Sequence, residues 1–501
     1  MTGDPGVKLK SAQGRWILAT TVLGSGMAFL DGTVVNVALP RIGEELGAGL
    51  SSLQWIVNAY TLTLAGLLLL GGSLGDRDGR RRWFVIGVVW FAVASALCAA
   101  AVSAPMLIAA RALQGVGAAL LTPGSLAIIE AVFAEEDRAP AVGAWSGLAG
   151  VTTAIGPFLG GWLVDAVSWR LAFLINLPLA AVVVWAAMRH VPETLDPGAA
   201  RRLDWTGATL AAAGLAGVVF ALTDGPGRGW TDPVIAVSGL AGTAMLVAFI
   251  WWERRAPNAM VPLSMFASRQ FTGANLVTFV VYAALGGSFF LLPLQLQRVL
   301  GYSALASGVS LLPVTVVMLL LSARAGRMAQ RSGPRLPMTA GPLIAAAGLF
   351  LMGMIGPGDT YLTAIRPAVL VFGLGLSLTV APLTATVLSA AGPERAGIAS
   401  AINNDVARVA GLIAVAALPV AAGLTGAEAL DPAVFSDGFR TALWIAAGLC
   451  AAGGLLAFAT IRRPEPAAAP PAPGPAERTG EVYSCPIGAP PAAARGGSRA
   501  P

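Results

Sequence analysis

Residues that build disulfides, metal sites and catalytic triads are scarce in this sequence. Its 501 residues include three cysteines (Cys98, Cys450 and Cys485) and a single histidine, His190. These numbers exclude a disulfide framework and a Cys/His metal cluster, and they argue against a His-based hydrolytic triad. The phosphate-binding pattern GxxxxGK[ST] does not occur, which argues against an ATP-driven pump. We therefore expect neither an enzyme nor a bound metal or organic cofactor.

Charged residues are also few. They make up 12% of the chain, whereas a soluble domain has about 25%, and 56% of the residues are hydrophobic. No loop is long enough to fold as a soluble receptor domain, and the Pro-, Ala- and Gly-rich tail at 464–501 is expected to be disordered. Basic residues retained on the cytoplasmic side of a membrane protein explain the net charge of +6 better than nucleic-acid binding does.

Long apolar segments are abundant. A membrane-spanning helix needs about 20 apolar residues. The first such segment is too long for a signal peptide and lacks a cleavage site, so we interpret it as an uncleaved span. The sequence predicts an all-α integral membrane protein with fourteen spans, at 16–37, 52–71, 83–102, 105–129, 140–164, 170–188, 205–222, 232–252, 272–294, 304–323, 337–355, 365–389, 399–421 and 439–460.

The arginines between these segments support the count. Clusters such as Arg80–Arg82 and Arg201–Arg202 alternate with single arginines such as Arg41 and Arg170. Because positive residues are retained in the cytoplasm, this alternation places both termini there, and a thirteen-span count breaks it. High Ala, Gly and Arg content favours a GC-rich bacterial genome, so the expected location is the bacterial cytoplasmic membrane.

The sequence contains an internal repeat. GSLGDRDGRR at 72–81 is echoed by GRMAQRSGPR at 326–335, and DRAPAVGA at 137–144 by ERAGIASA at 394–401. Parallel repeats with a substrate site between them are typical of secondary transporters. We expect a 6+2+6 arrangement: a cytoplasmic N-terminus at 1–15, a six-helix bundle at 16–190, two extra helices at 191–256, a second bundle at 257–463 and the tail at 464–501.

Four motifs carry a family resemblance that covers residues 15–463. They are LDGTVVNVALP (30–40), GSLGDRDGRRR (72–82), LIAARALQGVGAA (107–119) and GVTTAIGPFLGG (150–161). With them the chain resembles the 14-span drug:proton antiporters of the major facilitator superfamily. The resemblance implies proton-gradient-driven export of an amphiphilic small molecule by a lipid-embedded monomer. A facilitator or importer of one specific metabolite on the same fold remains the alternative.

Two spans carry acids that need a partner. Asp31 lies within the first span, where a charge is costly and usually functional. The first helix runs outward and the fourth inward, so Asp31 and Arg111 fall at similar depth and are predicted to pair, either for proton coupling or as a static ion pair. Asp405 and Arg408 lie three residues apart on one face of the thirteenth span. They form a second protonatable site or substrate contact, or a self-contained structural pair.

Two glycine-containing motifs are predicted to take part in conformational change. The loop between the second and third spans is interpreted as a latch, against topology set by arginine alone; its residues are Gly72, Asp76, Arg77, Gly79 and Arg80. The second-half copy has Gln330 where the first has Asp76, so a latch there is weaker. The fifth span is interpreted as a hinge, against plain helix packing, and the resemblance favours the hinge; its residues are Gly150, Gly156, Pro157, Gly160 and Gly161.

Polar side chains inside other apolar spans are candidates for a substrate cavity. Such groups suit an amphiphilic ligand, although each could equally form an interhelical hydrogen bond. The candidates are Asn58, Tyr60, Gln114, Asn275, Tyr282 and Gln295.

Overall fold

A computed structural model describes residues 6–196, 198, 203–257, 259–392 and 395–462. These residues contain fourteen helical segments that are long and apolar enough to cross a membrane, which confirms the predicted count. The long helices are α1 (Ala12–Leu46), α2 (Leu50–Asp78), α3 (Arg80–Ala99), α4 (Ala104–Val132), α5 (Glu135–Ala166), α8 (Trp205–Arg228), α9 (Pro233–Glu253), α10 (Arg269–Leu294), α12 (Leu312–Ser332), α13 (Arg335–Gly353), α14 (Arg366–Ala391), α15 (Ala396–Ala421) and α16 (Pro432–Thr460).

Four of the spans are interrupted. The sixth consists of α6 (Leu171–Leu174) and α7 (Asn176–His190), and the tenth of α11 (Ala304–Ser310) and α12. The ninth ends, and the twelfth begins, with a π turn, η2 (Gln295–Val299) and η3 (Tyr361–Ile365) respectively. Two 3-10 turns, η1 (Leu263–Ala267) and η5 (Ala427–Leu430), lie in connections.

Most helices extend beyond the predicted apolar limits, and α1 illustrates why. It starts after Ser11, whose hydroxyl accepts the Gly14 N–H at 3.0 Å, and it ends at Gly47, whose φ of 59° is left-handed. A helix ends where a capping residue satisfies its free backbone groups, and not where the apolar composition ends. The apolar run 16–37 therefore underestimated the length of this helix.

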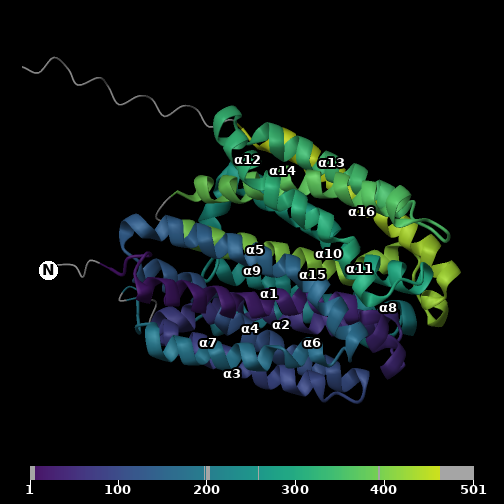
Figure 1. The fold of residues 1–501 in the computed structure, drawn as a ribbon, viewed down its shortest axis with the longest axis horizontal. Helices are drawn as coiled ribbons and strands as arrows, with labels where there is room; N and C mark the ends of the chain where they lie inside the picture. Colours follow the sequence, from purple (N-terminus) through teal and green to yellow (C-terminus); the bar gives the residue numbers. More distant parts are fainter. Residues whose placement is uncertain (1–5, 197, 199–202, 258, 393–394, 463–501) are drawn as a thin grey trace, which may run out of the picture. The chain divides into compact units, whose positions relative to one another are not determined.

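The two halves of the chain pack in the same way. In the first half α1 contacts α5 and α7, α4 contacts α2 and α3, and α3 contacts α7. The corresponding spans of the second half make the same pairs: α10 with α15 and α16, α14 with α12 and α13, and α13 with α16. Figure 1 shows the two groups, here named the N-terminal bundle (α1–α7) and the C-terminal bundle (α10–α16). The predicted repeat is thus a structural repeat, whereas the predicted residue limits of the domains stay a prediction.

The two ends of the bundles can be told apart by their connections. At the basic end, which holds Arg77–Arg82 and the first described residues of the chain, the Val7 N–H bonds to Val132 O at 2.9 Å and the Asp196 N–H to Asp76 O at 2.9 Å. At the opposite end, Arg170 bonds to Glu45 and to the carbonyl of Ala101. Successive helices run between these two ends.

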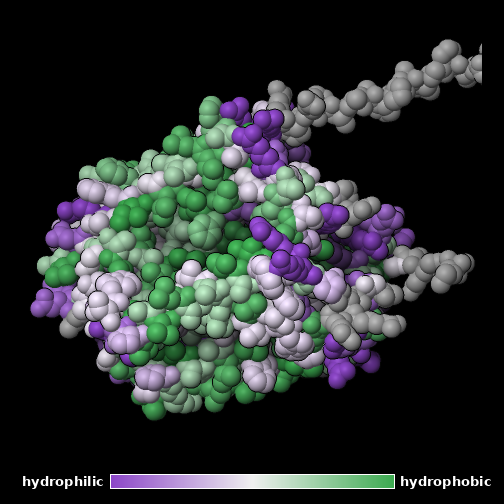
Figure 2. All heavy atoms as spheres, turned by 180° about the vertical axis from the view of Figure 1, so that it is seen from behind, coloured by the Kyte–Doolittle hydropathy of each residue, from purple (hydrophilic) through white to green (hydrophobic). Residues whose placement is uncertain are grey.

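The surface between the two ends is apolar. Figure 2 shows hydrophobic residues over much of one face, with hydrophilic residues gathered toward both ends. Large side chains on this surface are exposed, including Leu240 at 73% and Leu319 at 68%. Such exposure is favourable in lipid and unfavourable in water. The chain is a multi-pass membrane protein.

The extra helices α8 and α9 pack against each other, and α8 also contacts α2 and α15. The contact of α8 with the N-terminal bundle includes a hydrogen bond, because Trp55 Nε1 of α2 donates to Asp224 Oδ2 of α8 at 2.6 Å. Its contact with α15 is apolar and involves Leu215, Val219 and Leu412. The helix α8 therefore lies across the junction of the two bundles.

Candidate functional site

Hydrogen bonds between the two bundles lie near the opposite end. Gln54 Nε2 of α2 donates to Val415 O of α15 at 2.7 Å, and Gln297 Nε2 donates to Val37 O of α1 at 2.9 Å. Asp165 of α5 accepts the Leu305 N–H of α11 at 2.7 Å. Among the described residues, no hydrogen bond joins the bundles near the basic end. In this conformation the bundles are therefore fastened together at the opposite end.

Of the predicted hinge glycines, Gly156 and Gly160 pack against α1 within the N-terminal bundle, and Gly161 lies at the contact with α11 of the C-terminal bundle. A Cβ on Gly156 would stand 1.9 Å from Thr33 Oγ1 of α1, and one on Gly161 would stand 2.5 Å from Ala304 O of α11. Gly160 meets Val34 at 2.8 Å. These glycines permit close helix packing, one of the two alternatives drawn from the sequence.

Pro157 and Gly150 complete the predicted hinge. Pro157 lies inside a continuous α5, and its carbonyl would stand 2.1 Å from a Cβ on Gly308 of α11. Gly150 faces open space. A hinge at these residues stays a prediction.

Asp31 and Arg111 form a buried ion pair, the partnership predicted from their depths. Their side chains are 0% and 1% exposed. Arg111 Nη1 donates to Asp31 Oδ2 and to Gln114 Oε1, and Arg111 Nε donates to Ile56 O at 3.1 Å. A buried ion pair loses hydration, and additional hydrogen bonds of this kind are needed to offset that loss.

Further polar side chains enclose the carboxylate. Gln114 Nε2 donates to Asp31 Oδ1 at 2.8 Å and to Ser95 Oγ of α3 at 2.7 Å. Asn176, the first residue of α7, donates to Asp31 Oδ1 at 3.4 Å and to Ser95 at 3.2 Å. Ser95 and Asn176 were missed from the sequence, where the only signal was a polar residue in an apolar span. We name Asp31, Ser95, Arg111, Gln114 and Asn176 the buried network.

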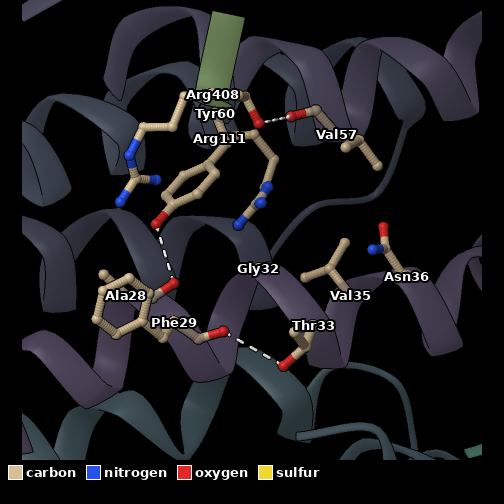
Figure 3. Close-up of a pocket in the computed structure, with 11 residues that line it drawn as sticks. Ala28, Phe29, Gly32, Thr33, Val35, Asn36, Val57, Tyr60, Arg111 and Arg408 are labelled. Atoms are coloured by element: carbon tan, nitrogen blue, oxygen red, sulfur yellow. Dashed lines mark hydrogen bonds between the residues drawn. The ribbon is translucent and has the colours of Figure 1, made fainter. Parts of the chain in front are cut away.

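A cavity of about 200 Å³ lies beside the buried network, lined by residues of α1, α2, α4 and α15 (Figure 3). Arg111 lines it but Asp31 does not, so the carboxylate is screened from the cavity by its partner. Tyr60 also lines it; its ring centroid is 4.3 Å from Arg111 Cζ, and its hydroxyl donates to Ala28 O at 3.1 Å. Tyr60 is the one predicted cavity residue that borders this cavity.

The other predicted cavity residues have different surroundings, and for Gln114, Asn275 and Gln295 the interhelical alternative holds; the bonds of Gln114 are those of the buried network. Gln295 donates to Ile355 O at 3.1 Å and to Ser436 Oγ at 3.2 Å, and Asn275 Oδ1 accepts from Asn403 at 3.1 Å. Hydrogen bonding between helices explains these polar residues without a ligand. The predicted residues away from the cavity are Asn58, Gln114, Asn275, Tyr282 and Gln295.

Asp405 and Arg408 do not form the self-contained pair that their spacing suggested. No ion pair within 4.0 Å joins them, and Asp405 Oδ1 and Arg408 Nε are buried without a hydrogen-bond partner among the described residues. An i, i+3 spacing brings two Cβ atoms near each other but does not fix side-chain directions. Arg408 instead extends into the cavity, where Figure 3 shows it in the region of Tyr60 and Arg111.

The predicted latch is an ordered turn at the basic end. Gly79, with φ of 120°, separates α2 from α3, and Arg80 Nε donates to Asp76 Oδ1 at 2.8 Å. The Glu193 carboxylate, which sequence reasoning missed, accepts the Arg81 N–H at 3.0 Å. This carboxylate therefore caps the first turn of α3.

The remaining latch residues have local contacts. Arg77 pairs with its neighbour Asp78 at 2.6 Å, and a Cβ on Gly72 would stand 3.5 Å from Pro123 of α4. Gln330, the second-half counterpart of the latch acid, is exposed.

The fourteen helices, the repeated bundle and a buried ion pair beside a cavity between the bundles define the architecture of a secondary transporter. The chain belongs to the Major Facilitator Superfamily, whose family model matches residues 21–416. It is 36% identical over 459 residues to the puromycin resistance protein of Streptomyces alboniger, covering 89% of this chain and 91% of that protein.

Other relatives give the same result. The methylenomycin A resistance protein of Streptomyces coelicolor is 36% identical over 449 residues, covering 89% of this chain and 92% of that protein. The multidrug resistance protein Stp of Mycobacterium tuberculosis is 35% identical over 402 residues, covering 80% and 74%. Among solved structures, a bacterial homologue of the human lysosomal transporter Spinster matches with a TM-score of 0.65 at 18% identity, covering 91% of this chain and all of the other.

Proposed function

We propose that this protein exports amphiphilic organic compounds across the bacterial cytoplasmic membrane in exchange for protons, by alternating access. The observation that carries the proposal is the buried Asp31–Arg111 pair at the wall of a cavity that both bundles line. The resistance proteins named above support export as the direction of transport. The basic end then faces the cytoplasm, together with both termini, and the protein works as a monomer.

In this proposal Asp31 is the coupling acid. Its carboxylate is closed off from the cavity by Arg111, so a proton reaches it only when the Arg111 side chain moves. Protonation removes the charge that Arg111 neutralises, which leaves a buried guanidinium without its partner. A conformational change that rehydrates Arg111 relieves that cost, and in this way the proton biases the equilibrium between the two faces.

The other predicted elements have supporting roles. The contact between α5 and α11 opens when the bundles separate at the opposite end, with the glycines of α5 as the flexible element. The Asp76–Arg80 turn stabilises one of the two states at the basic end. The cavity is smaller than the roughly 300–1,000 Å³ of common ligand sites, so binding of a larger compound requires the bundles to separate.

Export and coupling are tested together in a pump-deficient bacterial host. A panel of toxic amphiphilic compounds is compared for growth inhibition and accumulation, with the wild type, Asp31→Asn and Glu44→Gln at equal membrane abundance. Glu44→Gln is the control because it removes an exposed carboxylate that pairs with Arg41. We expect lower accumulation and higher resistance for the wild type and the control, and loss of both for Asp31→Asn.

Vesicle measurements separate the alternatives. In inverted vesicles the wild type should drive uptake when a pH gradient is imposed and stop when the gradient is collapsed. Full-rate transport by Asp31→Asn would rule out Asp31 as the coupling acid. Increased accumulation in whole cells would instead favour a facilitator or importer of a metabolite.

A further inference from the structure

Arg408 differs from the other cation of the cavity because, among the described residues, it forms no ion pair. Arg111 is neutralised by Asp31, and its guanidinium is also held by Gln114 and Ile56. The Arg408 Nε is buried without a hydrogen-bond partner, and in the described part of the chain no carboxylate lies within ion-pairing distance of its side chain. Nevertheless Arg408 lines the cavity, on the side formed by the C-terminal bundle.

The Arg408 side chain is half-buried, and only its Nε is enclosed without a partner among the described residues. A guanidinium nitrogen that loses hydration and gains no hydrogen bond is unfavourable. The arrangement becomes favourable when an oxyanion occupies the space in front of it. The planar fork of arginine matches a carboxylate, which it can bind through two parallel hydrogen bonds. The cavity adjoining Arg408 supplies that space.

The rest of the lining indicates the body of such a ligand. Phe29, Val35 and Val57 give the cavity apolar walls, and Tyr60 adds an aromatic ring. Asn36 Oδ1 is a second buried polar atom without a partner among the described residues, and it also borders the cavity. A compact apolar skeleton with a carboxylate at one end, and a hydrogen-bond donor elsewhere, matches these groups.

We infer that Arg408 is the substrate-recognition residue of this cavity, and that the compounds it selects carry a carboxylate or a similar oxyanion on a compact apolar body. This inference rests on the proposed export function, of which it specifies the substrate class. Organic cations, which need a free carboxylate or an unoccupied aromatic face, are disfavoured because Asp31 is engaged by Arg111 and Asp405 does not line the cavity.

Three probes of matched size test the charge preference. They are naphthoate, its uncharged methyl ester and the cation naphthylmethylammonium. Binding to the purified full-length protein in lipid nanodiscs is measured by titration calorimetry near neutral pH. No proton gradient is present, so the measurement does not depend on coupling.

The variants isolate the guanidinium. Arg408→Gln removes the charge, and Arg408→Lys keeps it without the fork. Arg440→Gln is the matched control because Arg440 is exposed, does not line the cavity and pairs with Asp437 on α16. Asp405→Asn removes the nearest acid on the same helix face. Thermal unfolding and size-exclusion profiles confirm that each variant is folded.

We expect the wild type and Arg440→Gln to bind naphthoate roughly tenfold more tightly than the ester, as one charge-assisted hydrogen-bond pair requires. In Arg408→Gln the preference should disappear while ester binding is retained, Arg408→Lys should be intermediate, and Asp405→Asn should bind naphthoate more tightly. Equal or weaker binding of naphthoate than of the ester by the wild type would overturn the inference. An undiminished preference in Arg408→Gln would also overturn it.

Export assays keep the two proposals apart. A carboxylate preference that depends on Arg408, found in a protein that shows no gradient-driven transport, would contradict the proposed function and leave this inference standing. Gradient-driven export of several compounds without any dependence on Arg408 would support the proposed function and contradict this inference.

Discussion

The two bundles differ in how their charged side chains are hydrogen-bonded. In the N-terminal bundle Asp31 and Arg111 are enclosed by Ser95, Gln114 and Asn176, so that both charges are hydrogen-bonded. In the C-terminal bundle Asn403 donates to Thr278 at 2.7 Å, but Asp405 and Arg408, further along α15, each have a buried polar atom with no partner in the described part of the chain.

This difference separates two kinds of role. An ion pair in which both charges are hydrogen-bonded holds its geometry until one charge is titrated, which suits an element that responds to protons. A cation that lines a cavity without forming an ion pair is available to bind an anion that enters the cavity. The backbone repeat is therefore not matched by a repeat of the charged side chains. The N-terminal bundle contributes the ion-paired Arg111 to the shared cavity, and the C-terminal bundle contributes Arg408.

The largest expected effect comes from removing one charge of the buried network. Asp31→Asn leaves Arg111 uncompensated and should lower the free energy of unfolding by about 3–5 kcal/mol. Adding Arg111→Gln should recover most of that stability without restoring transport, because the coupling acid is still absent. Thermal unfolding in nanodiscs measures both variants, and a double variant no more stable than Asp31→Asn would show that the two charges are not coupled.

Lysine substitutions compare the two arginines directly. Arg111→Lys should cost about 2–3 kcal/mol, because an ammonium cannot reach Asp31, Gln114 and Ile56 O in the geometry of the guanidinium. Arg408→Lys should change stability by less than about 1 kcal/mol, since no hydrogen bond of Arg408 Nε is lost. Equal losses in unfolding experiments would contradict the distinction between the hydrogen-bonded Arg111 and Arg408, whose Nε has no partner among the described residues.

The contact between the bundles offers a smaller effect. In Gly308→Ala the new Cβ meets the backbone carbonyl of Pro157, and we expect a loss of about 1–3 kcal/mol from overpacking. Distances between spin labels on α5 and α11 should also lengthen at the opposite end. Gly150→Ala is the control: its Cβ faces open space, and a helical alanine should leave stability unchanged or raise it by about 0.5–1 kcal/mol. A control as destabilised as Gly308→Ala would argue against overpacking as the cause.

The smallest effect is expected in the turn at the basic end. Glu193→Gln weakens the cap on α3 and should cost about 1 kcal/mol, measurable by thermal unfolding. Glu136→Gln removes an exposed acid from the first turn of α5 that accepts no hydrogen bond from the described residues, and it should cost only about 0.3–0.5 kcal/mol. A larger effect of Glu136→Gln than of Glu193→Gln would contradict the capping role.

Much of the architecture follows from local sequence. The fourteen spans were predictable because each one must be apolar over the membrane thickness, whatever its neighbours are. The pairing of Asp31 with Arg111 was also predictable, because helix direction and residue spacing place both at one depth. The turn at Gly79 between α2 and α3 was predictable as well, because glycine readily adopts the positive φ that such a turn requires.

Other features required the folded chain. The i, i+3 spacing of Asp405 and Arg408 suggested a pair, but the Arg408 side chain points into the cavity that α1 and α2 also line. Glu193 was missed because its partners lie 112 and 111 residues away in the sequence. Ser95 and Asn176 resembled ordinary polar residues of membrane helices until packing brought them to the same carboxylate.

By itself, then, the sequence determined the number and order of the spans, the repeat and the identity of the buried acid. These depend on composition and on helical rise, which are properties of single segments. Only the tertiary structure decided which polar side chains surround Asp31, which arginines face the cavity and at which end the bundles are joined by hydrogen bonds. Those outcomes depend on the directions of side chains from helices far apart in the chain, and packing alone selects those directions.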